Sequence, residues 1–166
     1  MRLGRGKTRP NDRFYSSMNR VAIISMHTSP LAQPGVGDGG GMNVYVRELV
    51  SAMAQTGLQC TTYTRAWREG LPEVIDVEPN HKVVHIKAGK FDLSKDELLD
   101  VVDEFTQAVA RDIELNGGTD VLHANYWLSG LVGHRLKHQL GLPLVNNFPY
   151  FGQSQISRWR HRIGGA

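Results

Sequence analysis

Apolar positions follow two different periods along this 166-residue chain. Short apolar runs rich in β-branched residues are typical of buried strands. Five runs have this pattern: residues 20–26, 58–64, 82–88, 120–124 and 142–145. Three longer stretches repeat apolar residues at helical spacing: residues 42–56, 94–115 and 126–140. Strands that alternate with helices predict an α/β fold, a parallel sheet with helices on both faces.

Local signals mark the ends of the predicted helices. Gly57 follows the first helix, where a helix C-cap belongs. Ser94 and Glu97 have the spacing of a capping box, which opens the second helix. Gly141 stops the third helix. Parallel sheets bind ligands at the carboxyl ends of their strands, so we expect Tyr126 and the segment after the first strand at the binding edge.

The composition is that of an ordinary globular domain. Hydrophobic residues make up 40% of the chain and charged residues 21%. No apolar run approaches the roughly 18 residues of a membrane span, and the first residues lack the apolar stretch of a secretory signal. Cys60 is the only cysteine, which excludes an internal disulfide and favours a reducing cytosol. We therefore expect a cytoplasmic protein.

The positive charge lies at the two ends of the sequence. Residues 1–20 hold six basic residues and one acid, and residues 146–166 hold three arginines and no acid. The segment between them carries a net charge of −5. A nucleic-acid surface needs basic residues gathered on a folded face. We therefore expect no nucleic-acid partner.

One glycine motif imitates a dinucleotide fingerprint. Gly35, Gly37 and Gly40 match the pattern G-x-G-x-x-G. The fingerprint needs its first glycine directly after the strand and an acid at the end of the second strand. Here the eight residues from His27 to Pro34 intervene, and the second strand is followed by Arg65, which suits only a 2′-phosphate. The long loop argues against a nicotinamide enzyme.

Two further motifs fail on their context. The stretch "GRGKT", residues 4–8, resembles a phosphate loop but no strand precedes it. His134 and His138 are four residues apart on a predicted helix and could share a metal ion. The residue after His134 is an arginine, whereas the zinc-protease motif H-E-x-x-H has a glutamate there, and no third ligand is evident. We expect a solvated helix face and no metal site.

The stretch "QPGVGDGGGMN", residues 33–43, runs into the first predicted helix. Such a loop presents unpaired N–H groups and the positive end of the helix dipole, which suits a phosphate. Asp38 makes sense if the ligand also carries hydroxyl groups, because a carboxylate accepts hydrogen bonds from them. Asn43, His27 and Tyr126 can serve the same pocket. Each also has a structural interpretation, as a cap, a satisfied histidine or a core aromatic.

Several stretches resemble a known family. They are "VAIISMHTSPLAQPGVGDGGGMNVYVREL", "YTRA", "LSKDEL" and "DVLHANYWLSGLVG". Between Arg20 and Val145 the chain resembles the N-terminal domain of family-4 retaining glycosyltransferases. The resemblance implies the N-terminal half of a two-domain GT-B fold, with the active site between two Rossmann-like halves.

The resemblance also implies a reaction. The most similar members transfer N-acetylglucosamine from UDP-N-acetylglucosamine to 1D-myo-inositol 3-phosphate in mycothiol biosynthesis. The implied partners are a nucleotide-sugar donor and a phosphorylated polyol acceptor, with no cofactor, no metal and no membrane span. The resemblance leaves a homodimer open.

The family's binding residues map onto positions of this chain, although none is identified as catalytic. The implied acceptor-binding residues are His27, Asp38, Gly39, Gly40, Gly41, Met42, Asn43, Lys95 and Tyr126. The implied donor-binding residues are Gln33, Pro34 and Gly41. Lys95 falls in the first turn of a predicted helix, where a cation opposes the helix dipole. That position supports a separate task for this lysine.

The resemblance stops after Val145. The family would continue as TTFHTLAxVK, whereas this chain reads NNFPYFGQSQ. Suitable codons for these letters, read one base later, spell TTFHTLAKVK. We therefore expect that an inserted base near codon 146 shifted the reading frame. The expected domains are a basic extension (1–20), a truncated Rossmann-like acceptor-side domain (21–145) and an aberrant, frameshifted tail (146–166).

This truncation has two expected consequences. The chain lacks the C-terminal domain that binds most of the UDP-sugar in this family, so alone it should be inactive. A sheet cut after its fifth strand also exposes an edge and apolar faces. We expect poor folding without a cooperative urea transition.

Two other functions stay open. The chain reads Ala88-Gly89-Lys90 where the family has AGP, which keeps open a related glycosyltransferase with a different acceptor. The other alternative is a non-catalytic module that binds a phosphorylated ligand or a partner chain.

Overall fold

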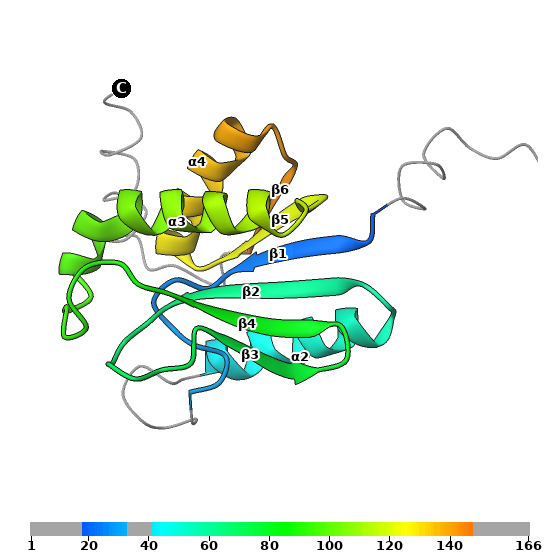
Figure 1. Cartoon of the computed structure of the whole chain (residues 1–166), viewed down its shortest axis with the longest axis horizontal. Helices are drawn as coiled ribbons and strands as arrows, with labels where there is room; N and C mark the ends of the chain where they lie inside the picture. Colours follow the sequence, from blue (N-terminus) through cyan, green and yellow to red (C-terminus); the bar gives the residue numbers. More distant parts are fainter. Residues whose placement is uncertain (1–17, 33–40, 148–166) are drawn as a thin grey trace, which may run out of the picture.

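Six strands form one sheet in the order β3-β4-β2-β1-β5-β6 (Figure 1). The computed structural model describes residues 18–32 and 41–147. Within them the strands are β1 (Arg20–Ile24), β2 (Gln59–Arg65), β3 (Val74–Glu78), β4 (His81–Ile86), β5 (Val121–Asn125) and β6 (Leu144–Asn147). All neighbours pair in parallel except β3, which is antiparallel to β4. The predicted α/β class is confirmed.

Strand β3 is the element that the sequence analysis missed. It is an edge strand whose side chains alternate between half-buried and exposed over much of its length. A short strand with this pattern has no continuous apolar run to mark it. Asn80 turns the chain back into β4 with a φ of 67°, in the left-handed region that asparagine tolerates.

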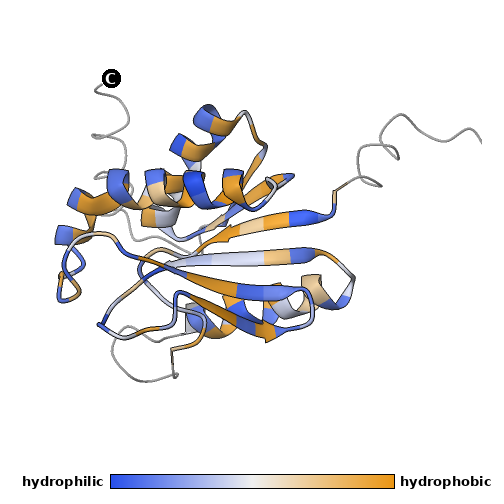
Figure 2. Cartoon of the chain, in the orientation of Figure 1, coloured by the Kyte–Doolittle hydropathy of each residue, from blue (hydrophilic) through white to orange (hydrophobic). Residues whose placement is uncertain are grey.

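Helices cover both faces of the sheet (Figure 1). Helix α2 (Gly41–Gln55) lies on one face. Helices α3 (Val102–Leu115) and α4 (Trp127–Leu140) lie on the other. Apolar and polar residues alternate along these helices (Figure 2), and most of their buried residues are apolar. None of the helices in the described part of the chain is long and apolar enough to cross a membrane.

The core therefore has two layers. The larger one packs α3 and α4 on the sheet, and Phe105, Ile24 and Leu122 are fully buried in it. The smaller one packs α2 against the opposite face through residues such as Val46 and Val50. Alternate residues of β1 enter opposite layers because successive side chains of a strand point to opposite faces.

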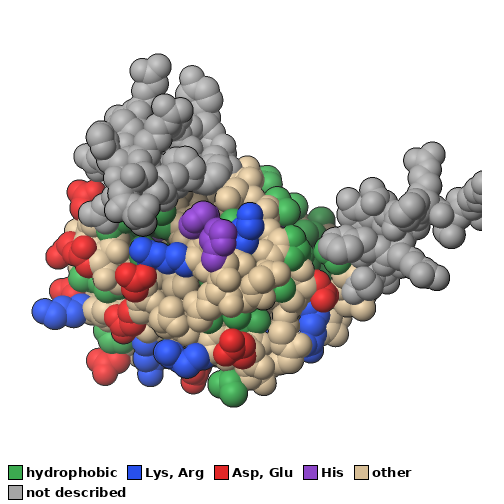
Figure 3. Space-filling view, turned by 90° about the horizontal axis from the view of Figure 1, so that it is seen from above, with side chains coloured by type: hydrophobic (Ala, Val, Ile, Leu, Met, Phe, Trp, Pro, Cys, Tyr) green, Lys and Arg blue, Asp and Glu red, His purple; other side chains and the backbone are tan. Residues whose placement is uncertain are grey.

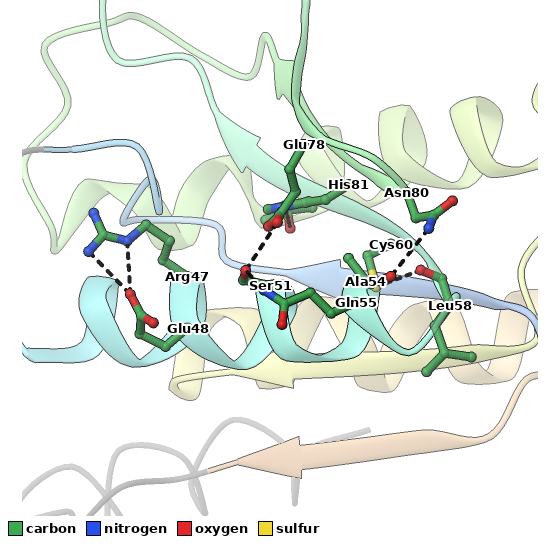
Figure 4. A network of polar contacts seen from close by, with 11 residues as sticks. Arg47, Glu48, Ser51, Ala54, Gln55, Leu58, Cys60, Glu78, Asn80 and His81 are labelled. Atoms are coloured by element: carbon green, nitrogen blue, oxygen red, sulfur yellow. Dashed lines mark hydrogen bonds and ion pairs between the residues drawn. The ribbon is translucent and has the colours of Figure 1, made fainter.

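Polar contacts tie the β3–β4 hairpin to α2 (Figure 4). The Ser51 hydroxyl donates to Glu78 Oε2 at 3.1 Å, and Asn80 Nδ2 donates to the Ala54 carbonyl at 3.2 Å. The other oxygen of Glu78 lies 3.6 Å from Nδ1 of His81. The hairpin thus gains a polar anchor beside the smaller core layer.

His81 is buried at the centre of this anchor. Its Nε2 lies 3.1 Å from the hydroxyl of Thr62, which is itself fully buried. Burial lowers the pKa of His81, and the nearby Glu78 opposes this effect only in part. Cys60 lies on the same face of β2, and burial together with Glu78 raises the pKa of its thiol to about 11. Both side chains are therefore neutral near pH 7.

The second predicted helix begins differently from the expectation. Residues Glu97–Val101 form a 3-10 helix, and the α-helix begins only at Val102. The carboxylate of Glu97 accepts hydrogen bonds from the backbone N–H of Ser94 at 2.8 Å and from its hydroxyl at 2.5 Å. These bonds lower the pKa of Glu97. The predicted pair is thus in contact, but Glu97 accepts both bonds and the Ser94 oxygen does not cap the helix.

The expected domain boundary falls inside a strand. Asn146 and Asn147 complete β6 and pair with Ala124 and Asn125 of β5. The basic extension up to residue 17 and the expected tail from residue 148 onward lie outside the described residues.

Candidate functional site

The chain reverses direction across the sheet between β1 and β5. After β1 it passes through α2 to β2 on one side, whereas after β5 it passes through α4 to β6 on the other. The two helices lie on opposite faces of the sheet (Figure 1). In open α/β sheets, ligands bind outside the carboxyl ends of the strands at such a switch point. The candidate site therefore lies where β1 and β5 end.

Hydrogen bonds fix the segment that leaves β1. The Ser25 hydroxyl donates to the Thr28 carbonyl at 2.7 Å. The Met26 N–H donates to the hydroxyl of Ser129, in the first turn of α4, at 3.0 Å. From the other side, Nδ2 of Asn43 in α2 donates to the Ser29 carbonyl at 3.1 Å. Both helices that start at the switch point thus hold the same loop.

His27 and Tyr126 meet at this switch point. Their ring centroids are 4.3 Å apart with the planes tilted by 31°. His27 follows β1 and Tyr126 follows β5, so the predicted pair comes from the two strands that flank the crevice. Ring contacts of this kind contribute stabilising free energy beyond that of the apolar area that the rings bury.

Tyr126 holds a strained backbone conformation. Its φ of 78° and ψ of 164° lie in a region that glycine adopts almost alone. Tyr126 is the residue before α4, and its side chain does not cap the helix. This backbone conformation turns the chain from β5 into α4 and leaves the Tyr126 ring beside His27. Strained residues of this kind cluster at functional sites.

The electrostatics at the switch point favour an anion. The first turns of α2 and α4 contain no acidic residue. Each helix begins there with backbone N–H groups that have no partner inside the helix and with the positive end of its dipole. A phosphate or carboxylate binds well at such a position.

The other predicted site residues have different positions. Gly41, Met42 and Asn43 form the first turn of α2, at the expected edge. Lys95 is exposed in the connection after β4, in a turn before the 3-10 helix and not in a helical turn as predicted. The remaining residues lie outside the described part of the chain: Gln33, Pro34, Asp38, Gly39 and Gly40.

Arg65 has a structural role. Its side chain is buried, and it donates hydrogen bonds to the carbonyls of Ala88 at 3.3 Å, Lys90 at 2.8 Å and Phe91 at 3.2 Å. Burial lowers the pKa of the guanidinium. These bonds hold the connection after β4 and engage both terminal nitrogens. Backbone carbonyls, and not a nucleotide 2′-phosphate, are therefore the partners that the structure gives to Arg65.

The histidine pair of α4 lies away from the switch point. His134 and His138 are exposed, with ring centroids 4.7 Å apart. Figure 3 shows a histidine pair beside basic side chains on the face that carries α3 and α4. Across residues 18–32 and 41–147, no three His, Cys, Asp or Glu side chains are grouped closely enough to hold a metal ion.

Two hollows lie away from the switch point. One, of about 60 Å³, lies between the first residues of β1 and β2 and the end of α3. The other, of about 270 Å³, is a groove between β4 and α3 beside the exposed Leu115. Neither is lined by His27, Asn43 or Tyr126.

Thr64 and Asn125 lie at the same edge and are not among the residues predicted from the sequence. Both are buried polar residues at the carboxyl ends of β2 and β5. Among the described residues, Thr64 Oγ1 and Asn125 Oδ1 have no hydrogen-bond partner. A polar residue at an inward position of a buried strand was the signal that could have found them.

A family model covers most of the chain. The model described as "Glycosyl transferase 4-like domain" matches residues 40–164. The chain belongs to this family. The match includes α2, the later strands and the strained start of α4, and so it agrees with the resemblance inferred from the sequence.

Two curated relatives support the same assignment. D-inositol 3-phosphate glycosyltransferase of Actinosynnema mirum is 47% identical over 132 residues, which are 78% of this chain and 32% of that protein. D-inositol 3-phosphate glycosyltransferase 2 of Catenulispora acidiphila is 42% identical over 137 residues, which are 81% of this chain and 32% of that protein. The chain therefore spans about a third of the length of the curated relatives it matches.

A solved structure confirms the fold. Sucrose-phosphate synthase from Thermosynechococcus elongatus superimposes with a TM-score of 0.77 at 29% identity. The match covers 84% of this chain and 35% of that one. The Rossmann-like N-terminal half of a GT-B glycosyltransferase, expected from the sequence, is the fold observed.

Proposed function

We propose that this chain is the acceptor-binding half of a retaining glycosyltransferase. In the proposed reaction, N-acetylglucosamine passes from UDP-N-acetylglucosamine to 1D-myo-inositol 3-phosphate. The proposal is supported by the names of the curated relatives, D-inositol 3-phosphate glycosyltransferases. Its main structural support is the ring contact between His27 and Tyr126 at the switch point.

The site chemistry suits this acceptor. The helix N-termini favour the phosphate group. The two rings offer a wall for the carbon skeleton of the polyol, and Asn43 offers hydrogen bonds to hydroxyl groups. We propose that Lys95 contributes a positive charge for the phosphate from the connection after β4. The segment from Gln33 through Asp38 to Gly41 completes the acceptor and donor sites in this proposal.

Calorimetric titration of the 166-residue chain with 1D-myo-inositol 3-phosphate tests the proposal. We expect binding without an added metal ion, and binding that persists with a chelator present. Tyr126→Ala should weaken binding about tenfold or more, because it removes the aromatic ring together with its hydroxyl group. Tyr45→Ala is the matched control, because Tyr45 is an exposed tyrosine on α2.

Transfer is tested separately from binding. We expect the chain alone to form no product from UDP-N-acetylglucosamine, since it spans only about a third of its relatives. A chain that binds UDP-N-acetylglucosamine but no inositol phosphate would contradict the proposed role. A related sugar phosphate that binds more tightly would favour a different acceptor in the same family.

A further inference from the structure

Thr64, Ser25 and Asn125 lie side by side on three neighbouring strands. Ile24 of β1 pairs with the residue before Thr64 on β2 and with the residue before Asn125 on β5. The three residues therefore continue the same register line at the carboxyl edge of the sheet. Ile24 faces the larger core layer, so these side chains point to the face that α2 covers.

Two residues of this line carry buried oxygens without a partner. Thr64 and Asn125 are each 1% exposed. Asn125 Nδ2 lies 3.2 Å from His123 Nδ1, but within the described residues its Oδ1 and the Thr64 hydroxyl bond to nothing. Asn43, in the first turn of α2, likewise has a buried Oδ1 without a hydrogen-bond partner among the described residues. Ser25 differs, because its hydroxyl donates to a loop carbonyl.

The unpartnered atoms share one chemistry. The amide oxygens of Asn43 and Asn125 can only accept hydrogen bonds, and the Thr64 hydroxyl can accept as well as donate. A buried acceptor without a donor is unfavourable, so three of them near one edge favour a ligand that brings O–H groups. The dianion of a phosphate monoester has no proton to donate to such an acceptor, and inorganic phosphate near neutral pH has only the one or two O–H groups of a single small ion. These atoms therefore suit the hydroxyl side of a polyol phosphate, and the helix N-termini suit its phosphate side.

We propose that Thr64 and Asn125 bind hydroxyl groups of the acceptor and so distinguish a polyol phosphate from phosphate alone. This inference rests on the function proposed above and adds two binding residues to it. Thr64 enters from β2 and Asn125 from β5, on either side of β1. Adjacent strands are about 4.8 Å apart, so the two side chains flank the end of β1 at a spacing of about 10 Å.

Strand β2 supplies a matched control. Thr62 lies two residues before Thr64, points to the same face and is equally buried. Its hydroxyl, however, has a partner in Nε2 of His81 at 3.1 Å. Thr→Val keeps the side-chain shape at both positions and removes only the hydroxyl. The Thr62 variant loses a hydrogen bond already made, whereas the Thr64 variant loses one that the ligand would make.

The test is calorimetric titration of the 166-residue chain with two probes, 1D-myo-inositol 3-phosphate and inorganic phosphate. Thr64→Val should bind inositol phosphate about fivefold more weakly and inorganic phosphate as before. Thr64→Ser keeps the hydroxyl and should bind both like the original chain. Thr62→Val should leave both affinities unchanged. Asn125→Ala should repeat the selective loss.

Thermal unfolding without ligand gives an independent readout. Thr64→Val should melt at the same or a higher temperature, because it removes a buried unpaired hydroxyl, and Thr62→Val should melt lower. Unchanged inositol phosphate affinity in Thr64→Val overturns the inference, and so does an equal loss for both probes. If the original chain binds no inositol phosphate, the proposed function fails first and the inference fails with it.

Discussion

At the scale of single residues, Tyr126 combines backbone strain with a side chain at the candidate site. Tyr126→Ala and Tyr126→Gly both remove the ring that contacts His27, but only glycine relaxes the strained backbone. Relief of about 1–3 kcal/mol of strain exceeds the entropic cost of glycine, about 0.5–1 kcal/mol. The two packed core layers favour a cooperative urea transition over the poor folding expected from the truncation. In that transition we expect Tyr126→Gly to be about 1 kcal/mol more stable than Tyr126→Ala.

The stability and affinity of Tyr126→Ala and Tyr126→Gly are both compared with those of the original chain. Both variants should bind inositol phosphate weakly, so stability and binding separate at this position. Equal stabilities of the two variants would show that the chain relaxes the strain by other means.

The sequence predicts the positions of some residues at the candidate site but not of others. His27 and Tyr126 were predicted at one edge because each follows a recognisable strand, and the structure brings their rings together. The strain at Tyr126 left no mark in the sequence, because it arises from the turn between β5 and α4. Thr64 and Asn125 were missed because a single residue type does not show whether a buried oxygen has a partner.

At the scale of secondary-structure elements, Gly133 sets how closely α4 approaches the sheet. A Cβ atom at this position would lie 2.8 Å from Leu144 Cδ1 and 3.1 Å from the Cβ of Ala124. Leu144 can rotate, but the Ala124 Cβ is fixed to β5. Gly133→Ala should therefore push α4 outward and destabilise the chain by about 1–3 kcal/mol, despite the better helix propensity of alanine.

Urea unfolding of Gly133→Ala measures this effect. His134→Ala, on the exposed side of the same helix, is the control and should change stability by less than about 0.5 kcal/mol. A Gly133→Ala variant as stable as the original chain would show that α4 can shift without loss.

The elements also show why one strand was missed. The five predicted strands are all present, because buried parallel strands read as continuous apolar runs. Strand β3 is held mainly by pairing with β4 and by the Ser51–Glu78 bond to α2. The pairing joins β3 to the next strand of a hairpin, and the Ser51–Glu78 bond spans 27 residues. A pattern of apolar residues reports neither contact. The 3-10 start before α3 has the same kind of cause, because Leu98 packs into the larger core layer.

At the scale of the whole molecule, two histidines make stability depend on pH: His81, which is buried, and His123, which is half-buried. Burial lowers the pKa of both His81 and His123 below the ordinary value of 6.5. Between that value and the lower pKa of the folded state, the unfolded chain binds more protons than the folded chain. Stability is therefore fully present above about pH 6.5 and decreases as the pH falls through this range.

We expect a lower free energy of unfolding at pH 5.5 than at pH 7.5, measured with urea. His81→Gln removes one of the two groups, so the difference between the two pH values should shrink in that variant. His134→Gln, which removes an exposed histidine of α4, should keep the full difference. Of the two histidines, only His81 contacts Glu78 and Thr62. An unchanged difference in His81→Gln would therefore assign the acid sensitivity to His123, beside Asn125 at the candidate site. Acid would then act on the ligand-binding edge and leave the hairpin anchor intact.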